Sequence, residues 1–557
     1  MFIASFFYKN YRGTAIKIGL LTLISGFFES LSFLSLLPIV DIIINNGNPD
    51  SQIAATIFST IKSFNFDVSL GLLLLAMVLT LIFKEVIRSY TLILAGYTTA
   101  RVASDYRTAL VKNIFNADWS FINRLRVGAM ANSITTETHR ASSLFMYFVK
   151  TYMYTLQIII YLTLAVFISI EVTSLAIFTG LLMFVSLNFL IKISGKAGEE
   201  QTNSFTLLVS SFTDFMGSMK VFKAMGVASL ASQKTIKEIE NINCSLRKST
   251  FSSVTLSFFQ EMIPIIILII ALYLSVTILG VSFSSFVVAS ALFMSLIRRV
   301  TSLQKQLNGA ANQESTFTSV YKNINKARQN EELNTGKNKF SIRKQIVFED
   351  VLFKYAKLKK VNITIPVNKL TVLTGKSGIG KTSIVDALVG LSEIDSGNIY
   401  FDDYEIKDID IKELRANIGY VGQDISLLND TIFNNITLFD DSISESLVKK
   451  TLKKVDAYDF VMSLESGLSY MVGEKGGKLS GGQKQKICIA RAIIRNPKLI
   501  IFDEITSSLD SESDYEISSL AKDLSKNSTV ISIAHKGSMS NFADKLYLLT
   551  EDTVSEI

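Results

Sequence analysis

Six long apolar segments lie in the first 310 residues of this 557-residue chain. They cover approximately residues 15–45, 69–98, 143–170, 172–194, 252–280 and 283–303. About 20 apolar residues in a helix are enough to cross the hydrocarbon core of a bilayer. The first segment is too long for the core of a signal peptide and has no small-residue cleavage site, so it is expected to stay as a membrane helix. Residues 1–310 are therefore predicted to form an all-α transmembrane domain with six helices.

The basic residues outside these segments are distributed unevenly. The polar stretches that follow the second and the fourth segment are rich in Lys and Arg, whereas residues 46–68 hold only Lys62. Loops rich in Lys and Arg stay in the cytoplasm. This rule places the N terminus, two long intracellular loops and the C-terminal half in the cytoplasm, and the chain in the cytoplasmic membrane as a multi-pass protein.

Several charged residues lie within the predicted spans. Charges in a membrane segment face a cavity or one another. The candidates for such a role are Glu29, Lys84, Glu85, Arg88, Lys150 and Glu261. The spacing of Lys84, Glu85 and Arg88 on one helix favours local pairing. Helix packing and a role in a substrate cavity both remain open for these residues. Pro38 and Pro264 are expected to kink their helices.

Composition excludes several classes of function. The net charge is +7, but the Lys and Arg residues gather at the ends of apolar segments rather than in a patch with aromatic residues, so no nucleic-acid partner is expected. Two cysteines, Cys244 and Cys488, do not suggest a disulfide framework. Two histidines, His139 and His535, exclude a His-rich metal site.

The C-terminal half has the pattern of a different fold. Residues 311–345 are polar and read as a linker, with a helical start left open. Residues 346–557 alternate strands with helices, which predicts an α/β domain with a mostly parallel sheet. The segment from 375 to 382 fits the phosphate-binding P-loop pattern between a strand and a helix. It reads Gly375, Lys376, Ser377, Gly378, Ile379, Gly380, Lys381 and Thr382.

The P-loop pattern predicts a site for ATP and Mg²⁺. The backbone amides of the loop and the start of the following helix, which includes Ser383, would bind phosphates. Lys381 would reach the β- and γ-phosphates, and the hydroxyl of Thr382 would bind Mg²⁺. A buried strand at 499–502 ends in Asp503, a candidate Mg²⁺ ligand, and in Glu504, a candidate to polarise the attacking water.

Leu479, Ser480, Gly481, Gly482 and Gln483 precede this strand by about twenty residues. With the P-loop and the two acids, this order of motifs resembles the ATP-binding cassette (ABC) family, specifically exporters with six membrane helices fused to one P-loop NTPase domain. The resemblance covers nearly the whole chain. Departures are small: Gly422, Lys486 and Ile505 stand where proline, arginine and alanine are frequent.

The resemblance assigns further site residues. Tyr355 looks like the aromatic that stacks on adenine, and Gln423 is similar to the glutamine that senses Mg²⁺ and couples to the membrane domain. His535 looks like the histidine that contacts the γ-phosphate. Residues 472–476 resemble the segment that exporters use against their intracellular loops, and residues 507–510 resemble the loop that crosses the dimer seam.

The resemblance also implies a partner. In this family ATP lies between the P-loop of one domain and the signature, here Leu479 to Gln483, of another. One chain has one P-loop and one signature, so a homodimer in membrane lipid is expected, and the intact motifs disfavour a heterodimer. The tips of the intracellular loops, near 117–126 and 215–225, are candidates for coupling, with the Asp118–Phe121 segment docking near Gln423.

Sequence therefore predicts ATP-driven export or flipping of an amphipathic substrate across the cytoplasmic membrane, in a chain of bacterial origin. A lipid-linked oligosaccharide flippase, a lipid flippase and a peptide exporter are alternatives within this class, and no motif selects among them. From other classes, a membrane sensor that binds ATP without transport remains open. A soluble ATPase acting in DNA repair or translation is disfavoured by the six spans.

Overall fold

The computed structural model describes most of the chain. The described residues are 7–44, 69–168, 170–274, 283–353, 358, 360–506, 510–534, 537–551 and 553–557, with 55, 56, 59 and 63. The chain divides into two compact units by its internal contacts. One consists of Met1–Ala117 and Arg124–Glu331, and the other of Asp118–Asn123 and Glu332–Ile557.

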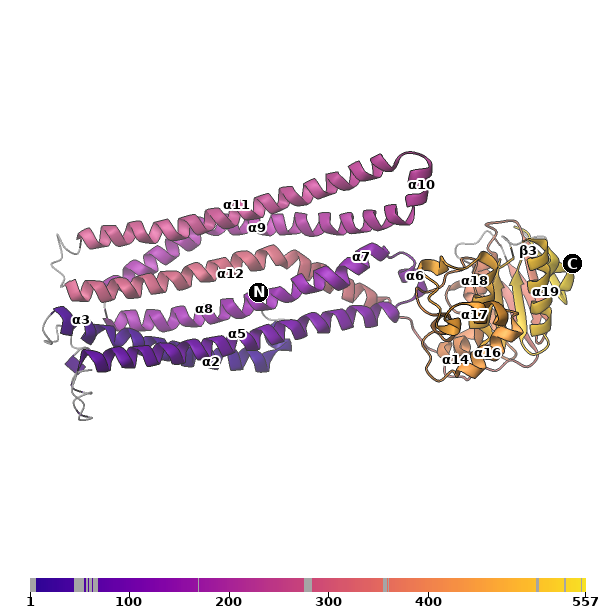
Figure 1. Ribbon diagram of the computed structural model, residues 1–557, viewed down its shortest axis with the longest axis horizontal. Coiled ribbons are helices and arrows are strands. Elements are labelled where there is room, and N and C mark those ends of the chain that lie inside the picture. Colours follow the sequence, from indigo (N-terminus) through magenta and orange to yellow (C-terminus); the bar gives the residue numbers. More distant parts are fainter. Residues whose placement is uncertain are drawn as a thin grey trace. The chain divides into compact units, whose positions relative to one another are not determined.

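The first unit is helical throughout its described part, and its long helices run side by side (Figure 1). Helix α8 packs against α12, and α9 packs against both α11 and α12. The helices are α2 (Arg12–Leu34), α3 (Leu36–Ile44), α5 (Leu70–Phe115), α7 (Val127–Asn132), α8 (Thr138–Ile168), α9 (Ile170–Gly217), α10 (Met219–Ala224), α11 (Ala228–Leu274) and α12 (Phe283–Gln329).

Five stretches among the described residues are long and apolar enough to cross a membrane. They are Arg12–Ile43, Leu70–Phe115, Val127–Phe167, Thr173–Gly217 and Ala228–Ala271. Each of them overlaps one of the first five predicted spans, and the bounds differ most for the third, fourth and fifth. The sixth predicted span, 283–303, is not among these five and lies in the N-terminal part of α12. Residue 45 of the first span and residues 275–280 of the fifth lie outside the described residues.

Four helices are much longer than a bilayer is thick. Helices α5, α9, α11 and α12 contain 46, 48, 47 and 47 residues. At the rise of an α-helix each is about 70 Å long, whereas the hydrocarbon core measures about 30 Å. The predicted polar loops are therefore built largely from continuous extensions of the membrane helices.

Proline affects the two predicted kink sites differently. Between α2 and α3 the helix breaks at Ser35, and Pro38 lies in the first turn of α3. Proline is tolerated in the first turn because the amide it lacks has no partner there. By contrast, α11 continues through Pro264.

A buried ion cluster joins three helices of the first unit. The Glu29 carboxylate on α2 pairs through Oε1 with Lys84 Nζ of α5 at 2.6 Å and with Arg299 Nη2 of α12 at 2.7 Å. The Arg299 guanidinium lies 5.5 Å from the centre of the Tyr161 ring. Glu29 is only 4% exposed, so its charge depends on these partners.

Local pairing of Lys84, Glu85 and Arg88 is confirmed. Glu85 Oε1 lies 3.3 Å from Lys84 Nζ and 3.5 Å from Arg88 Nη1. The pairing of Glu29 with Lys84 and Arg299 was not predicted, because these three residues come from helices that are distant in the sequence. Glu261 is exposed on α11.

Near the polar stretch that follows the second predicted span, polar contacts hold the helices together. Glu137 ends a π-helical turn, η1 (Ser133–Glu137), and is buried. Its carboxylate accepts hydrogen bonds from Ser133 at 3.0 Å, from Thr206 of α9 at 3.0 Å and from Ser319 of α12 at 3.1 Å. Several donors around one buried carboxylate compensate for its lost hydration.

The second unit contains two sheets. A four-stranded antiparallel sheet has the order β2-β1-β4-β5, and a six-stranded sheet has the order β10-β9-β3-β8-β7-β6. In the larger sheet all neighbours pair in parallel except β10. The strands are β1 (Gln345–Phe353), β2 (Val361–Pro366), β3 (Leu370–Gly375), β4 (Ile394–Phe401), β5 (Tyr404–Glu405), β6 (Ile418–Val421), β7 (Leu499–Asp503), β8 (Thr529–Ile533), β9 (Lys545–Leu549) and β10 (Val554–Glu556).

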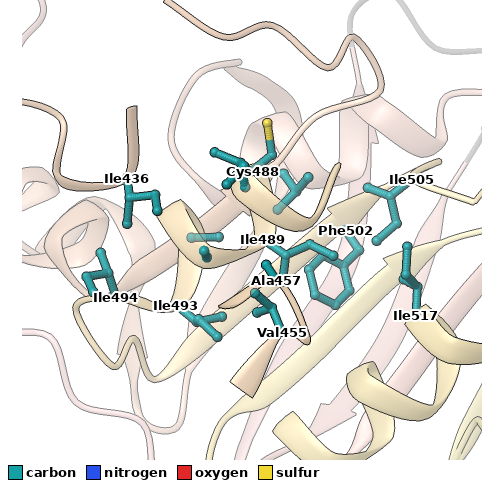
Figure 2. Packing of buried hydrophobic residues seen from close by; sticks show 14 of the residues in the cluster. Ile436, Val455, Ala457, Cys488, Ile489, Ile493, Ile494, Phe502, Ile505 and Ile517 are labelled. Atoms are coloured by element: carbon teal, nitrogen blue, oxygen red, sulfur yellow. The ribbon is translucent and has the colours of Figure 1, made fainter. Parts of the chain in front are cut away.

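Helices pack around this larger sheet. They are α13 (Lys381–Leu388), α14 (Ile411–Ala416), α15 (Ile432–Thr437), α16 (Glu445–Lys454), α17 (Tyr458–Ser463), α18 (Gly481–Ile493), α19 (Ser511–Leu524) and α20 (Ser538–Phe542). Figure 2 shows Ile489 of α18, Phe502 of β7 and Ile517 of α19 in one buried cluster. Helix α18, which begins in the signature, is thus anchored by apolar packing to the strand that ends in Asp503.

Replacing Glu29 with Gln tests the buried ion cluster. The substitution keeps the shape of the side chain but leaves Lys84 and Arg299 with a neutral partner, so we expect a loss of about 3 kcal/mol of stability. Thermal unfolding of the chain in detergent measures this loss. As a control, Glu200→Gln breaks the ion pair with Lys248, whose side chains are half exposed, and should leave the midpoint unchanged. Equal shifts for the two variants would contradict a special role of the cluster.

Candidate functional site

The P-loop connects β3 to α13. Gly375 ends the strand, and Lys381 begins the helix. Gly378 and Gly380 have φ angles of 76° and 118°, which side chains with a Cβ rarely adopt. The loop can therefore turn its amides inward only with glycine at these positions. Lys376, Ser377 and Thr382 are exposed, Ser383 is half-buried and Ile379 is buried in the domain core.

Lys381 is buried under this loop. Its Nζ donates hydrogen bonds to the carbonyl oxygens of Gly375 at 2.8 Å and Lys376 at 3.4 Å, and lies 3.8 Å from Glu504 Oε1. Burial lowers the pKa of this ammonium, while Glu504 and Asp503 act in the opposite direction. The ammonium is held within the loop by weak neutral acceptors that phosphate oxygens could replace.

Asp503, at the end of β7, is 3% exposed. The Tyr420 hydroxyl lies 3.4 Å from its Oδ2, and its Oδ1 is buried without a hydrogen-bond partner. Burial, reinforced by the neighbouring Glu504 charge, raises the pKa of Asp503 to about 6. A buried carboxylate with one unpartnered oxygen fits a divalent cation, which prefers oxygen ligands. The structure therefore fits the predicted Mg²⁺ ligand.

Glu504 has an unusual backbone conformation. Its φ is 52°, in the left-handed region that costs a non-glycine residue about 1–2 kcal/mol. Its amide donates to the Ile533 carbonyl at 3.0 Å, and its Oε2 accepts from Gln423 Nε2 at 2.8 Å. Backbone strain of this kind concentrates at functional sites. The structure thus brings together Glu504, Gln423 and Lys381, three of the residues predicted to be catalytic.

The signature forms the exposed start of a different helix. Ser480 caps α18: its Oγ accepts from the Gln483 amide at 3.3 Å, and its own amide donates to Gln483 Oε1 at 3.0 Å. A Cβ on Gly481 or Gly482 would meet nothing within 4 Å. Both segments are fully described, and no hydrogen bond joins Ser480–Gln483 to residues 375–383. The start of α18 thus offers amides and a helix dipole that the chain's own P-loop does not use.

Two residues of α18 that sequence reasoning missed hold this helix in place, one of them next to Glu504. Gln485 is fully buried, and its amide donates to the carbonyl of Ile505, the residue after Glu504. Arg491 donates to the Asn435 carbonyl at 2.7 Å and to the Ser426 carbonyl at 3.2 Å. Only the proximity of Gln485 to the signature could have drawn attention to it, and for Arg491 the sequence offers no signal.

The other predicted site residues either lie outside the described part of the chain or have a role that stays a prediction. Tyr355, His535 and residues 507–509 lie outside the described residues. The segment 118–123 groups with the second unit, and it contains α6 (Trp119–Ile122). Asp118 caps α6 by accepting from the Phe121 amide at 2.8 Å. Its docking near Gln423 remains a prediction, as does a coupling role for 215–225, which contains α10.

Two family models match the chain. The model of the ABC transporter transmembrane region covers residues 15–300, and the ABC transporter model covers residues 358–507. A solved chain, from the structure of a bacterial Atm1-family ABC exporter with ATP bound, matches with a TM-score of 0.77 at 20% identity. That match covers 99% of this chain and 96% of the other.

Curated relatives extend the comparison. An uncharacterised ABC transporter ATP-binding protein of Sinorhizobium fredii is 41% identical, over 38% of this chain and 37% of its own length. A protein of Methylobacillus flagellatus named ATP-dependent lipid A-core flippase is 28% identical, over 66% of this chain and 63% of its own length. The chain thus spans less than two thirds of these two relatives. Another protein of that name, from Syntrophus aciditrophicus, is 26% identical over 86% of this chain and 81% of its own length.

These matches confirm the predicted family and the predicted fold class, an exporter-type helical membrane domain with a β-containing nucleotide-binding domain. The chain belongs to the ABC transporter family and carries the membrane region and the ATP-binding domain in one polypeptide.

Proposed function

We propose that this chain is an ATPase that exports or flips an amphipathic substrate across the cytoplasmic membrane, working as a homodimer with two composite ATP sites. The observation that carries the proposal is the separation of two complementary half-sites in one chain. The P-loop, Asp503 and Glu504 form one half, and the exposed start of α18 forms the other. Because no hydrogen bond joins the two fully described segments 375–383 and 480–483, the second half is free to serve another subunit's ATP.

In the proposed mechanism, the P-loop amides and Lys381 bind the phosphates of ATP. Lys381 exchanges its two carbonyl acceptors, on Gly375 and Lys376, for phosphate oxygens. Ser480 and the amides of Gly481 and Gly482 from the second subunit complete the cage around the γ-phosphate. Donors fixed in advance around the transferred group stabilise the charge of the transition state.

Glu504 is placed to orient and polarise the attacking water, and Gln423 holds its carboxylate at 2.8 Å. Thr382 and Asp503 would hold Mg²⁺, together with Gln423 when it leaves Glu504. The ion would neutralise charge on the phosphates. In the same proposal Tyr355 stacks on adenine, and His535 contacts the γ-phosphate.

The substrate class follows from the membrane domain and the relatives. Two of the relatives above are named as lipid A-core flippases, which favours a lipid-like amphipath over a peptide. The described spans combine apolar helices with a buried ion cluster, as an amphipathic substrate would require. With the N terminus and the ATP-binding domain in the cytoplasm, ATP would drive movement across a bacterial cytoplasmic membrane.

Replacing Glu504 with Gln tests whether hydrolysis is the engine. The amide cannot act as a base, so ATP turnover should fall by at least about 100-fold while ATP binding persists. Phosphate release and retention of labelled ATP in reconstituted protein measure the two effects. The matched control Glu512→Gln changes a residue in the first turn of α19 and should keep normal turnover. Full transport by the Glu504→Gln variant would show that ATP hydrolysis does not drive transport.

A complementation experiment tests the composite site. A chain with Lys381→Met and a chain with Ser480→Arg are each inactive as homodimers, because every site lacks one half. Together they form heterodimers in which one site joins the intact P-loop of one chain to the intact signature of the other. Random pairing should restore about a quarter of normal ATPase activity, because half of the dimers carry one intact site of two.

Tandem affinity tags on the two chains isolate the mixed dimers, which should show about half of normal activity because each carries one intact site of two. If each chain closed its own site, neither chain would supply a working site, and mixing would restore no activity. That result would exclude the proposed exchange of signatures between subunits.

A further inference from the structure

The segment after α12 is fixed onto the ATP-binding domain. This segment, here named the strap, comprises residues Glu332–Asn338. It begins three positions after Gln329, the last residue of α12. The amides of Lys337 and Asn338 donate to the Asp408 carbonyl at 3.0 and 2.9 Å, and the Asp410 amide donates to the Asn338 carbonyl at 2.9 Å. The strap is therefore paired to the chain that leads into α14.

Side chains and close packing strengthen this attachment. Asn334 donates from Nδ2 to Asp410 Oδ1 at 3.1 Å and accepts from the Ile411 amide at 3.2 Å. A Cβ on Gly336 would lie 2.0 Å from the Ile409 carbonyl oxygen, so the backbones approach too closely for any side chain. The strap is held along its length, in a way that a loose linker is not.

Arg415 of α14 joins the strap to another element. Its Nη1 and Nη2 bind both oxygens of Glu332, at 2.8 and 2.6 Å. The same guanidinium donates from Nε to the Val389 carbonyl at 3.0 Å and from Nη2 to the Gly390 carbonyl at 2.9 Å. Four hydrogen bonds to a planar group fix its position and its orientation together.

The two carbonyl acceptors follow directly on α13. Val389 is the residue after Leu388, which ends the helix that begins at Lys381. Carbonyls at the end of a helix lack intrahelical donors and attract cations. Arg415 thus binds the end of α13 opposite to the one that faces the phosphates.

Stability alone is a weak reason for this arrangement. The side chains of Arg415 and Glu332 are 31% and 30% exposed, and ion pairs at that exposure contribute little. A bidentate pair with two further carbonyl bonds adds geometric definition instead. The contact is therefore better suited to transmitting a displacement between two elements than to stabilising the fold.

We propose that Arg415 is a positioning residue that connects the P-loop helix α13 to the strap, and so to the end of α12. On this view, ATP binding at the start of α13 moves the helix as a rigid body, and Arg415 and Glu332 pass the displacement into the chain that continues as α12. This route is separate from the loop tips near 117–126 and 215–225. The inference rests on ATP binding at the P-loop, as the proposed function requires.

Hydrogen exchange of the full-length chain in lipid nanodiscs tests the route. In the Glu504→Gln background, Mg-ATP should protect residues 375–388, where it binds, and should change exchange in residues 317–329 of α12. Adding Glu332→Gln should leave the first response intact and reduce the second by at least about twofold. The second variant, Arg415→Lys, loses the bidentate geometry and should have the same effect.

Glu445→Gln is the matched control. It breaks the 2.6 Å ion pair of Glu445 with Lys449 in the same unit, without touching the strap, and should leave both responses unchanged. An unchanged α12 response in both Glu332→Gln and Arg415→Lys would overturn the inference, and so would an equal loss in the Glu445→Gln control. Absence of ATP-dependent protection at 375–388 in the reference chain would overturn the proposed function and the inference with it.

Discussion

Parallel pairing of β3, β8, β7 and β6 is the constraint on which the nucleotide site depends. In parallel strands the carboxyl ends meet at one edge of the sheet, and ligands bind beyond that edge. The P-loop follows β3, Asp503 ends β7, and Gln423 follows β6. The same pairing brings the Glu504 amide to the Ile533 carbonyl of β8, which holds Glu504 in its left-handed conformation. Sheet topology thus supplies the strain as well as the proximity.

The signature helix α18 is held in place by strand β7, which also carries Asp503. Its apolar face packs on Phe502 of β7 (Figure 2), and the buried Gln485 amide binds the carbonyl of Ile505. The group proposed to serve another subunit's ATP is therefore fixed to this subunit's own catalytic strand. In a dimer built as proposed, a shift of β7 in one subunit would therefore displace groups in both composite sites.

Local motifs made the nucleotide half of the chain predictable. The P-loop, the acids after 499–502 and the signature each act within a few residues, so their order predicted both the fold and the positions of Lys381, Asp503 and Glu504. Long-range ionic contacts could not be predicted in this way. Glu29 and Arg299 are 270 positions apart, and Glu332 and Arg415 are 83 apart. Nothing in one sequence selects such partners among the many charged residues present.

The end of α12 shows how long-range contacts, which the sequence does not predict, decide where a helix ends. Sequence placed a linker at 311–345, because its polar residues lack an apolar period, and left open whether its start is helical; in the structure α12 continues to Gln329. Polar pairing stabilises this part of the helix: Ser319 and Asn323 face the buried turn around Glu137. Only Asn330 and Glu331 then separate the end of α12 from the strap, and the amides of both donate to carbonyls in the last turn of α12. Helix α13 has eight residues and measures about 12 Å. Because it is so short, a movement at its phosphate end is expected to displace its other end as well. A short rigid helix and a short link to α12 are what a mechanical connection between ATP and the membrane helices requires.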